Sequence, residues 1–186
     1  NAGVLLTKLI QVSCGAVYDK EGNPSYINSF KRLSVLKEVI DEASKKVIVF
    51  APYTAVLRMI EGFLVKTYGR SSIAYIDGTV PKEKRFEIMN SFQEQKTLKV
   101  LVAHPKPISH GVTLTAADTN LWYAPITSND VYSQANGRIY RISQDSKTNV
   151  INLFASKAEE KIYKGLVSKK ENQDILLELI REYTHG

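Results

Sequence analysis

The sequence predicts an α/β domain in which a mostly parallel sheet carries helices on both faces. Short runs of apolar, often β-branched residues alternate with longer segments whose apolar residues recur at helical spacing. Runs that are apolar throughout are typical of strands covered on both sides. The alternation continues without a repeat, an internal linker or a low-complexity segment. It therefore favours parallel strands joined by helical crossovers.

The predicted elements follow one another in a regular order. Pro81 fits the first turn of a helix, because a proline there loses no helical hydrogen bond. The other helices are predicted from apolar residues that share one face, and the strands from short apolar runs. The predicted helices are 29–44, 56–69, 81–92 and 129–140, and the predicted strands are 47–50, 72–76, 98–103, 120–124 and 149–154.

The two ends of the chain differ from this alternating region. Residues 3–17 are mostly apolar and favour a helix, whereas 18–28 form a polar turn rich in Gly, Asn and Pro. From Ala158 onward the pattern predicts helix, interrupted over 169–172. We therefore expect three segments, namely a lead-in over 1–28, an α/β lobe over 29–157 and a C-terminal helical extension over 158–186.

The composition is compatible with a polyanionic partner without identifying one. The 186 residues carry a formal net charge of +6, and the pI is near 9.3. No run approaches the length needed to cross a bilayer, so no membrane partner is expected. The single Cys14 excludes an internal disulfide and is interpreted as a core residue of a cytoplasmic protein. Because the chain opens with Asn-Ala, we expect it to be a piece of a longer protein.

The most informative segment is 134–144, Gln-Ala-Asn-Gly-Arg-Ile-Tyr-Arg-Ile-Ser-Gln. It holds Arg138 and Arg141, and on a helix two residues three apart lie on the same face. A planar, permanently charged guanidinium suits phosphate oxygens, so two of them at one place indicate a polyphosphate ligand. Such a pair alone also occurs on solvated helix faces, and the surrounding sequence decides between these readings.

Four blocks along the chain, at 47–53, 76–92, 111–119 and 134–144, resemble the motifs of superfamily 2 helicases in their Swi/Snf-like form. Residues 47–53 resemble motif IV, 76–92 the D-G-S block that follows it, and 111–119 the later part of motif V. Residues 134–144 resemble motif VI, with Ser143 where glycine is usual. The resemblance implies a RecA-like three-layer sandwich that forms the second motor lobe of a nucleic-acid translocase or helicase.

The chain lacks the parts of an ATP site that such proteins carry in their first lobe. It contains no G-x-x-x-x-G-K-[ST] phosphate loop and no strand that ends in an Asp-Glu pair. The resemblance implies that ATP and Mg²⁺ are held mainly by a missing N-terminal RecA-like lobe, and that this chain alone is inactive. It implies Arg141 as the arginine finger on the γ-phosphate, with Arg138 as its partner. It also implies Gln134, Gly137 and Gly111 on the ATP side, and a structural role for Gln134 is equally open.

The resemblance further implies contacts with the sugar-phosphate backbone of nucleic acid, expected to be duplex DNA. Backbone N–H groups and small hydroxyls at the ends of strands suit phosphate and carry no sequence information. Binding is therefore expected to be weakly sequence-specific and strongly salt-dependent. For Tyr53, packing of the ring on the sheet is an equal alternative. The residues implied are Ala51, Pro52, Tyr53, Gly78, Thr79, His104 and Thr113.

The loop over 103–111 departs from the usual motif V. It is one residue longer, with His104 in place of threonine and, further on, Thr113 in place of asparagine. Its A-H-P…H-G form resembles bacteriophage members of the group, for which the location would be the host cytoplasm. His104 and His110 lie six apart without a nearby Cys or acidic residue, so no metal site is predicted.

Other residues have simpler interpretations. Trp122 is expected in the core, and 45–46 at a solvated helix end. Lys82, Lys84 and Arg85 are also interpreted as solvated, with contact to DNA phosphates as the alternative. The alternative function is a catalytically inactive helicase-fold module that only binds nucleic acid or a partner protein. A small-molecule domain is disfavoured because no G-x-G-x-x-G follows a predicted strand.

Overall fold

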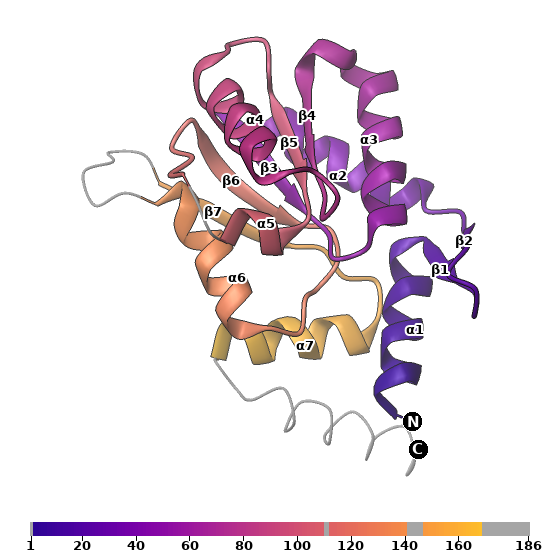
Figure 1. The fold of residues 1–186 in the computed structure, drawn as a ribbon. Helices are drawn as coiled ribbons and strands as arrows, with labels where there is room; N and C mark the ends of the chain where they lie inside the picture. The colour runs from indigo at the N-terminus through magenta and orange to yellow at the C-terminus, as the bar shows by residue number, and fades with distance from the viewer. Residues whose placement is uncertain (1, 110–111, 141–146, 169–186) are drawn as a thin grey trace.

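The computed structural model describes residues 2–109, 112–140 and 147–168 and confirms the RecA-like α/β architecture (Figure 1). Five strands form one parallel sheet in the order β4-β5-β3-β6-β7. Because β3 lies between β5 and β6, the chain builds one side of the sheet first and then the other. The strands are β3 (Lys46–Phe50), β4 (Ile73–Ile76), β5 (Val100–Ala103), β6 (Ala117–Trp122) and β7 (Asn149–Asn152).

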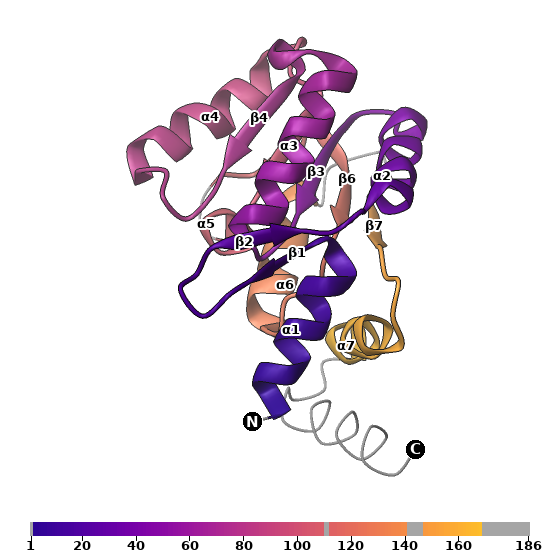
Figure 2. The ribbon, with the colours of Figure 1, turned by 90° about the vertical axis from the view of Figure 1, so that its right-hand side faces the viewer.

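Helices cover both faces of this sheet (Figures 1 and 2). Alternate residues of a strand enter the two cores, so Val47 and Val49 face one side while Ile48 and Phe50 face the other. This explains why the run 47–50 is apolar throughout. None of the helices in the described part of the chain is long and apolar enough to cross a membrane. One core contains α2 (Phe30–Glu42) and α3 (Thr54–Tyr68), and the other contains α4 (Lys82–Glu94), α5 (Pro105–Ser109), α6 (Asn129–Asn136) and α7 (Lys157–Ser168).

Two core predictions are confirmed. Trp122 is fully buried and its ring packs at a tilt against Phe50 and Tyr132, with centroids 4.7 Å apart in both pairs. Cys14 is also fully buried, and burial raises the pKa of its thiol to about 12. A thiol that stays protonated is a poor nucleophile, so Cys14 acts as a small core residue.

The amino-terminal segment differs from the sequence prediction. Helix α1 (Ala2–Cys14) stops before residue 17, and the predicted polar turn contains an antiparallel hairpin of β1 (Ala16–Tyr18) and β2 (Pro24–Tyr26). The helix ends at Gly15, whose φ of 98° favours glycine and where a Cβ would collide with Ser29. The prediction of a helix through residue 17 is therefore wrong.

Lys46 also differs from its interpretation as a solvated helix end. It is the first residue of β3, and its ammonium group donates to the carbonyls of Phe92 and, at 2.8 Å, Gln95. Burial lowers the pKa of this ammonium group. The side chain therefore ties the end of α4 to the start of the central strand.

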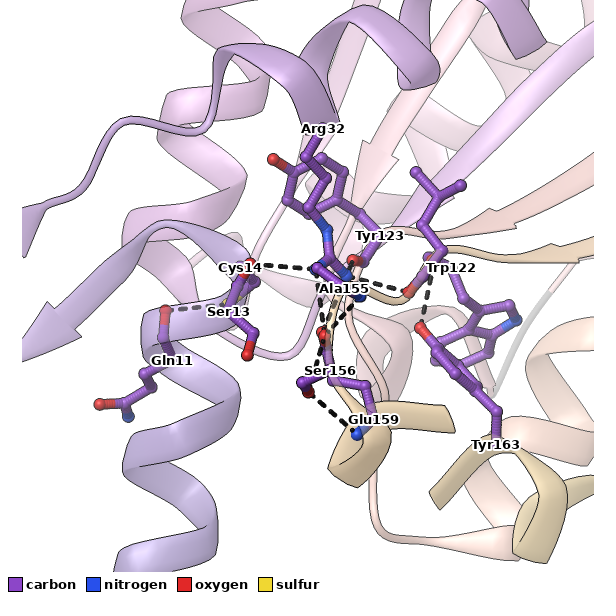
Figure 3. Close-up of polar contacts among 11 residues, drawn as sticks. Gln11, Ser13, Cys14, Arg32, Trp122, Tyr123, Ala155, Ser156, Glu159 and Tyr163 are labelled. Atoms are coloured by element: carbon purple, nitrogen blue, oxygen red, sulfur yellow. Dashed lines mark hydrogen bonds and ion pairs between the residues drawn. The ribbon is translucent and has the colours of Figure 1, made fainter. Parts of the chain in front are cut away.

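A buried ion pair joins five parts of the chain (Figure 3). Arg32 on α2 contacts Glu159 on α7 at 2.8 Å, and the Glu159 side chain is fully buried. The same guanidinium group donates to the carbonyls of Ser13 (3.0 Å), Leu153 (2.9 Å) and Tyr123. These carbonyls belong to α1 and to the segments just after β7 and β6. The pair therefore fixes α1, α2 and α7 against the carboxyl ends of two strands.

Candidate functional site

The loops after β3, β4 and β5 lie side by side at the carboxyl-terminal edge of the sheet. The Ala51 N–H donates to the Ala103 carbonyl at 3.4 Å, and the His104 N–H donates to the Ile76 carbonyl at 2.8 Å. Strand pairing thus continues just beyond the strands, which aligns the loops that follow. Six of the predicted nucleic-acid residues meet here, namely Ala51, Pro52, Tyr53, Gly78, Thr79 and His104.

These residues differ in how much they show to solvent. Gly78 and Thr79 are exposed, and Pro52 and His104 are half-buried. Ala51 is fully buried, which leaves its methyl group no route to a ligand. Among these six residues, the exposed ones therefore belong to the turn that follows β4.

That turn is held by the carboxylate of Asp77, which is only 1% exposed. One oxygen accepts from the Thr79 N–H at 2.9 Å and from the Thr79 hydroxyl at 2.6 Å. The other accepts from the Tyr75 hydroxyl at 2.9 Å and from Arg58 at 3.4 Å. The N–H and the hydroxyl of Thr79 therefore both donate hydrogen bonds within the turn in this structure.

The contacts of Asp77 also set its charge. Burial opposes the ionised carboxylate, but the hydrogen bonds from Thr79 and Tyr75 and the nearby Arg58 charge outweigh it. Together they hold the pKa of Asp77 below its ordinary value of 3.8. The turn is consequently fixed by an ionised group at neutral pH.

Sequence reasoning missed the partners of this carboxylate. Arg58 comes from α3, and its guanidinium carbon lies 4.1 Å from the centre of the Tyr75 ring. The sequence marks Asp77-Gly78 only as a turn, and no local signal connects it with an arginine 19 positions earlier. Only the packing of α3 beside β4 brings the two groups together.

His104 connects the loop after β5 with the loop after β3. Its Nδ1 accepts from the Lys106 N–H at 3.3 Å, and its ring is hydrogen-bonded to the backbone of Pro52. Burial, and then the positive charge of Lys106, lower the pKa of the imidazole. His104 is therefore neutral at pH 7, and it orders two neighbouring loops at this edge.

For Tyr53, the structure favours packing on the sheet. The side chain is partly buried and packs against both cores. Burial raises the pKa of its hydroxyl above the ordinary value. A backbone contact near Tyr53 stays a prediction, whereas the ring is engaged by the protein.

The arginine-bearing helix is shorter than predicted. Helix α6 ends at Asn136 and continues as a single 3-10 turn, Gly137–Ile139, after which Tyr140 is extended. The Asn136 side chain accepts from Trp122 Nε1 at 2.9 Å and from the Asn120 amide at 3.1 Å. This contact holds Asn136 against the sheet, and the next residue, Gly137, is a weak helix former. The α-helix therefore ends at Asn136. The α-helix predicted over 129–140 is thus confirmed only as far as Asn136.

Arg138 lies in this 3-10 turn, whereas Arg141 and Gly111 lie outside the described residues. The Arg138 side chain is half-buried, and its carbonyl accepts from the Leu114 N–H at 2.7 Å. The segment containing Leu114 leads to the amino-terminal edge, where the Lys46 N–H donates to the Ala116 carbonyl at 3.3 Å. The end of α6 is thus fastened to the segment before β6.

The structure therefore divides the predicted site residues into two groups. Thr113 directly precedes Leu114, whose N–H donates to the Arg138 carbonyl, and its contact with nucleic acid stays a prediction. The chain from α5 crosses back here to the start of β6. Gln134 and Gly137 are exposed near Arg138. One group lies in the loops after β3, β4 and β5, and the other surrounds the end of α6.

The described residues offer no metal centre. Over 2–109, 112–140 and 147–168, no three His, Cys, Asp or Glu side chains gather closely enough to hold an ion.

The comparisons with known proteins agree on one protein family. The helicase conserved C-terminal domain matches residues 31–143, which is more than half of the chain. The ATP-dependent helicase ULS1 of Saccharomyces cerevisiae is 31% identical over 76% of the chain and 9% of its own length. The chromatin-remodeling ATPase INO80 of Emericella nidulans is 26% identical over 82% of the chain and 10% of its own length. The chain thus spans about a tenth of the curated relatives it matches.

Solved structures support the same fold. The SWI2/SNF2 ATPase core domain of Sulfolobus solfataricus matches 91% of the chain and 35% of its own length, with a TM-score of 0.64 and 22% identity. The C-terminal part of the Fun30 ATPase domain matches 75% of the chain and 48% of its own length, with a TM-score of 0.63 and 21% identity. At these identities the likeness establishes the fold.

Proposed function

Because this chain belongs to the helicase conserved C-terminal domain family, we propose that it is the second motor lobe of an ATP-dependent nucleic-acid translocase of the Swi2/Snf2 type. The main support is the family match over 31–143, which contains both groups of site residues. The first lobe of the same protein would supply the phosphate loop and hold most of ATP and Mg²⁺.

The group around the end of α6 would serve the nucleotide. Arg141 would place its guanidinium on the γ-phosphate, with Arg138 as its partner, and Gln134, Gly137 and Gly111 would line the same side. The charge that develops during phosphoryl transfer is stabilised mainly by such positioned cations. The contacts of Asn136 with the sheet support this role, because a catalytic arginine must be held in position by the residues around it.

The group at the carboxyl edge would contact nucleic acid, with duplex DNA as the expected track. The Gly78–Thr79 turn is exposed, and the neighbouring loops are held by Asp77 and His104. Fixed backbone groups of this kind suit phosphate contacts without sequence preference. Lobe closure on ATP and opening after hydrolysis would then move this group along the strand.

The same proposal covers the segment boundaries of the chain and its cellular location. The 1–28 segment would lead in from the first lobe, and 158–186 would extend from the second. Helix α1 packs against α7, which supports a shared role for these two ends. A cytoplasmic location, and a bacteriophage origin with it, stay predictions.

The proposed motor role can be tested in the full-length protein that contains this chain. Arg141→Ala is expected to reduce nucleic-acid-stimulated ATP turnover by roughly 10³ to 10⁵ fold while ATP binding is retained. Arg70→Ala is a matched control, because Arg70 is an exposed arginine paired with Glu61 at 2.6 Å and lies outside both groups. Turnover would be measured with duplex DNA, single-stranded DNA and RNA.

Two results would reject the assignment. Normal turnover in Arg141→Ala would remove the arginine finger. Absence of ATP turnover in the unmodified protein, with nucleic-acid binding intact, would instead establish the inactive binding module.

A further inference from the structure

A hydrogen-bond cluster joins strand β6 to the end of helix α6. The Asn136 side-chain oxygen accepts from the Trp122 indole N–H at 2.9 Å and from the Asn120 amide at 3.1 Å. Both donors come from β6 and are fully buried. Asn136 is the last residue of α6, and the 3-10 turn that carries Arg138 begins directly after it. The cluster thus holds the chain at the point where the helix changes into that turn.

The indole determines how the cluster is oriented. Because an indole nitrogen only donates, the Asn136 atom that faces Trp122 is the oxygen. Asn120 then turns its amide nitrogen toward the same oxygen. The Asn120 oxygen accepts no hydrogen bond from the residues that the structure describes, and a buried acceptor without a partner costs stability. An apolar side chain at position 120 would avoid this cost, so stability alone does not account for the cluster.

The turn after Asn136 is also held at its middle and at its end. The Arg138 carbonyl accepts from the Leu114 N–H at 2.7 Å. The next residue, Ile139, is only 1% exposed and packs in the core. The backbone on both sides of Arg138 therefore has a fixed position, and the direction in which the chain continues is fixed with it.

We propose that Asn136 is a positioning residue for ATP turnover, which acts through the arginine turn and is itself held by Asn120 and Trp122. The inference rests on the proposed function and extends it to three residues that would not touch ATP themselves. An α-helix rotates by about 100° per residue, and a 3-10 helix by about 120°. If the α-helix continued past Asn136, each following side chain would point in a different direction. The hydrogen bonds of Asn136 stop the helix and so set the direction of Arg138.

The test is Asn136→Ala in the full-length protein that contains this chain. Alanine removes the acceptor and is the best helix former, so α6 is expected to continue and to displace the arginine turn. Because a misplacement of about 1 Å can cost about 10² fold in rate, kcat with saturating duplex DNA should fall by about 10 to 10² fold. The KM for ATP should change little, since the arginines act on the charge that develops during phosphoryl transfer.

Tyr132→Phe is a matched control in the same helix. It removes a hydroxyl that donates to the Asn152 side chain on β7 at 3.1 Å and leaves the ring packed against Trp122. Both variants lose hydrogen bonds between α6 and the sheet, but only Asn136→Ala changes the end of the helix. Urea unfolding would compare their stability losses, and kcat should stay normal in Tyr132→Phe.

A second comparison separates positioning from a general loss of stability. In protein that already carries Arg138→Ala and Arg141→Ala, adding Asn136→Ala should cause no further fall in single-turnover ATP hydrolysis, because the groups that it positions are gone. The contact itself can be followed by hydrogen exchange of the Trp122 indole N–H in protein with isotope-labelled tryptophan. Its signal is identified by its absence in Trp122→Phe, and its exchange should be faster in Asn136→Ala.

The outcomes distinguish this inference from the proposed function. A fall in kcat that is confined to Asn136→Ala, and that disappears when both arginines are absent, supports the inference. Normal kcat in Asn136→Ala, an equal fall in Tyr132→Phe, a further fall without the arginines, or unchanged indole exchange would each overturn it and leave the translocase proposal in place. Normal turnover without both arginines, or no turnover in the unmodified protein, would instead reject the proposed function and this inference with it.

Discussion

At the carboxyl ends of β6 and β7 the sheet is closed by a buried ion pair, whereas at the ends of β3, β4 and β5 it finishes in turns that reach solvent. On the closed side, Arg32 donates to the carbonyls of Ser13 and Leu153 and pairs with Glu159, which holds α1 and α7 against this end of the sheet. On the open side, Asp77 fixes the backbone but leaves Gly78 and Thr79 exposed. The carboxyl-terminal edge thus has a closed side fixed by buried charges and an open side with an ordered, exposed turn.

The largest effect is expected from opening the closed side. Glu159→Gln leaves the Arg32 charge buried beside a neutral group, and losing one partner of a buried pair costs about 3–5 kcal/mol of unfolding free energy. Urea unfolding would measure the loss. Glu160→Gln is the control, because its partner Lys164 is 72% exposed and such surface pairs contribute at most about 1 kcal/mol. Equal losses in the two variants would contradict the distinction between a closed and an open side.

A smaller effect is expected from the open side. Asp77→Asn removes the ionised acceptor of Thr79 and Tyr75, and hydrogen bonds to a charged group contribute about 1.5–3 kcal/mol. The same variant should weaken nucleic-acid binding, because the turn loses its anchor. Glu87→Gln, which alters an exposed pair with Lys84, should change stability by less than about 1 kcal/mol. Unaltered DNA affinity in Asp77→Asn would separate the turn from the binding surface.

The smallest effect concerns pH. The pKa of Asp77 is lower in the folded chain than its ordinary value of 3.8, so the unfolded chain binds the proton more strongly. The stability contributed by Asp77 is therefore complete above that value and is lost as pH falls through the folded pKa. Urea unfolding as a function of pH should show the difference between the unmodified chain and Asp77→Asn shrinking in that range. A difference that stays constant to lower pH would show that Asp77 is neutral in the folded state.

Local sequence patterns predicted the elements whose stability is local. The strand over 47–50 was predicted because a strand buried on both faces is apolar throughout. The helices α2 and α3 were predicted because a helix buried on one face has apolar residues at regular spacing. Trp122 and Cys14 were placed in the core for the same reason. The errors occur at ends, where Gly15 stops α1 and where the Asn136 side chain stops α6.

Contacts between distant parts of the chain could not be predicted in this way. Arg32 and Glu159 are 127 positions apart, and neither differs in its local sequence from an ordinary surface charge. Likewise, motif spacing did not show that the segment before β6 contacts the end of α6, where the Leu114 N–H donates to the Arg138 carbonyl.

The sequence by itself determined that the chain alternates strand and helix and carries the helicase-like blocks. Both features depend on the spacing of residues that are close together in the sequence. Only the tertiary structure decided which loops meet and which charges are buried. Those properties depend on strand order and on helix packing, which bring together side chains that no local pattern connects.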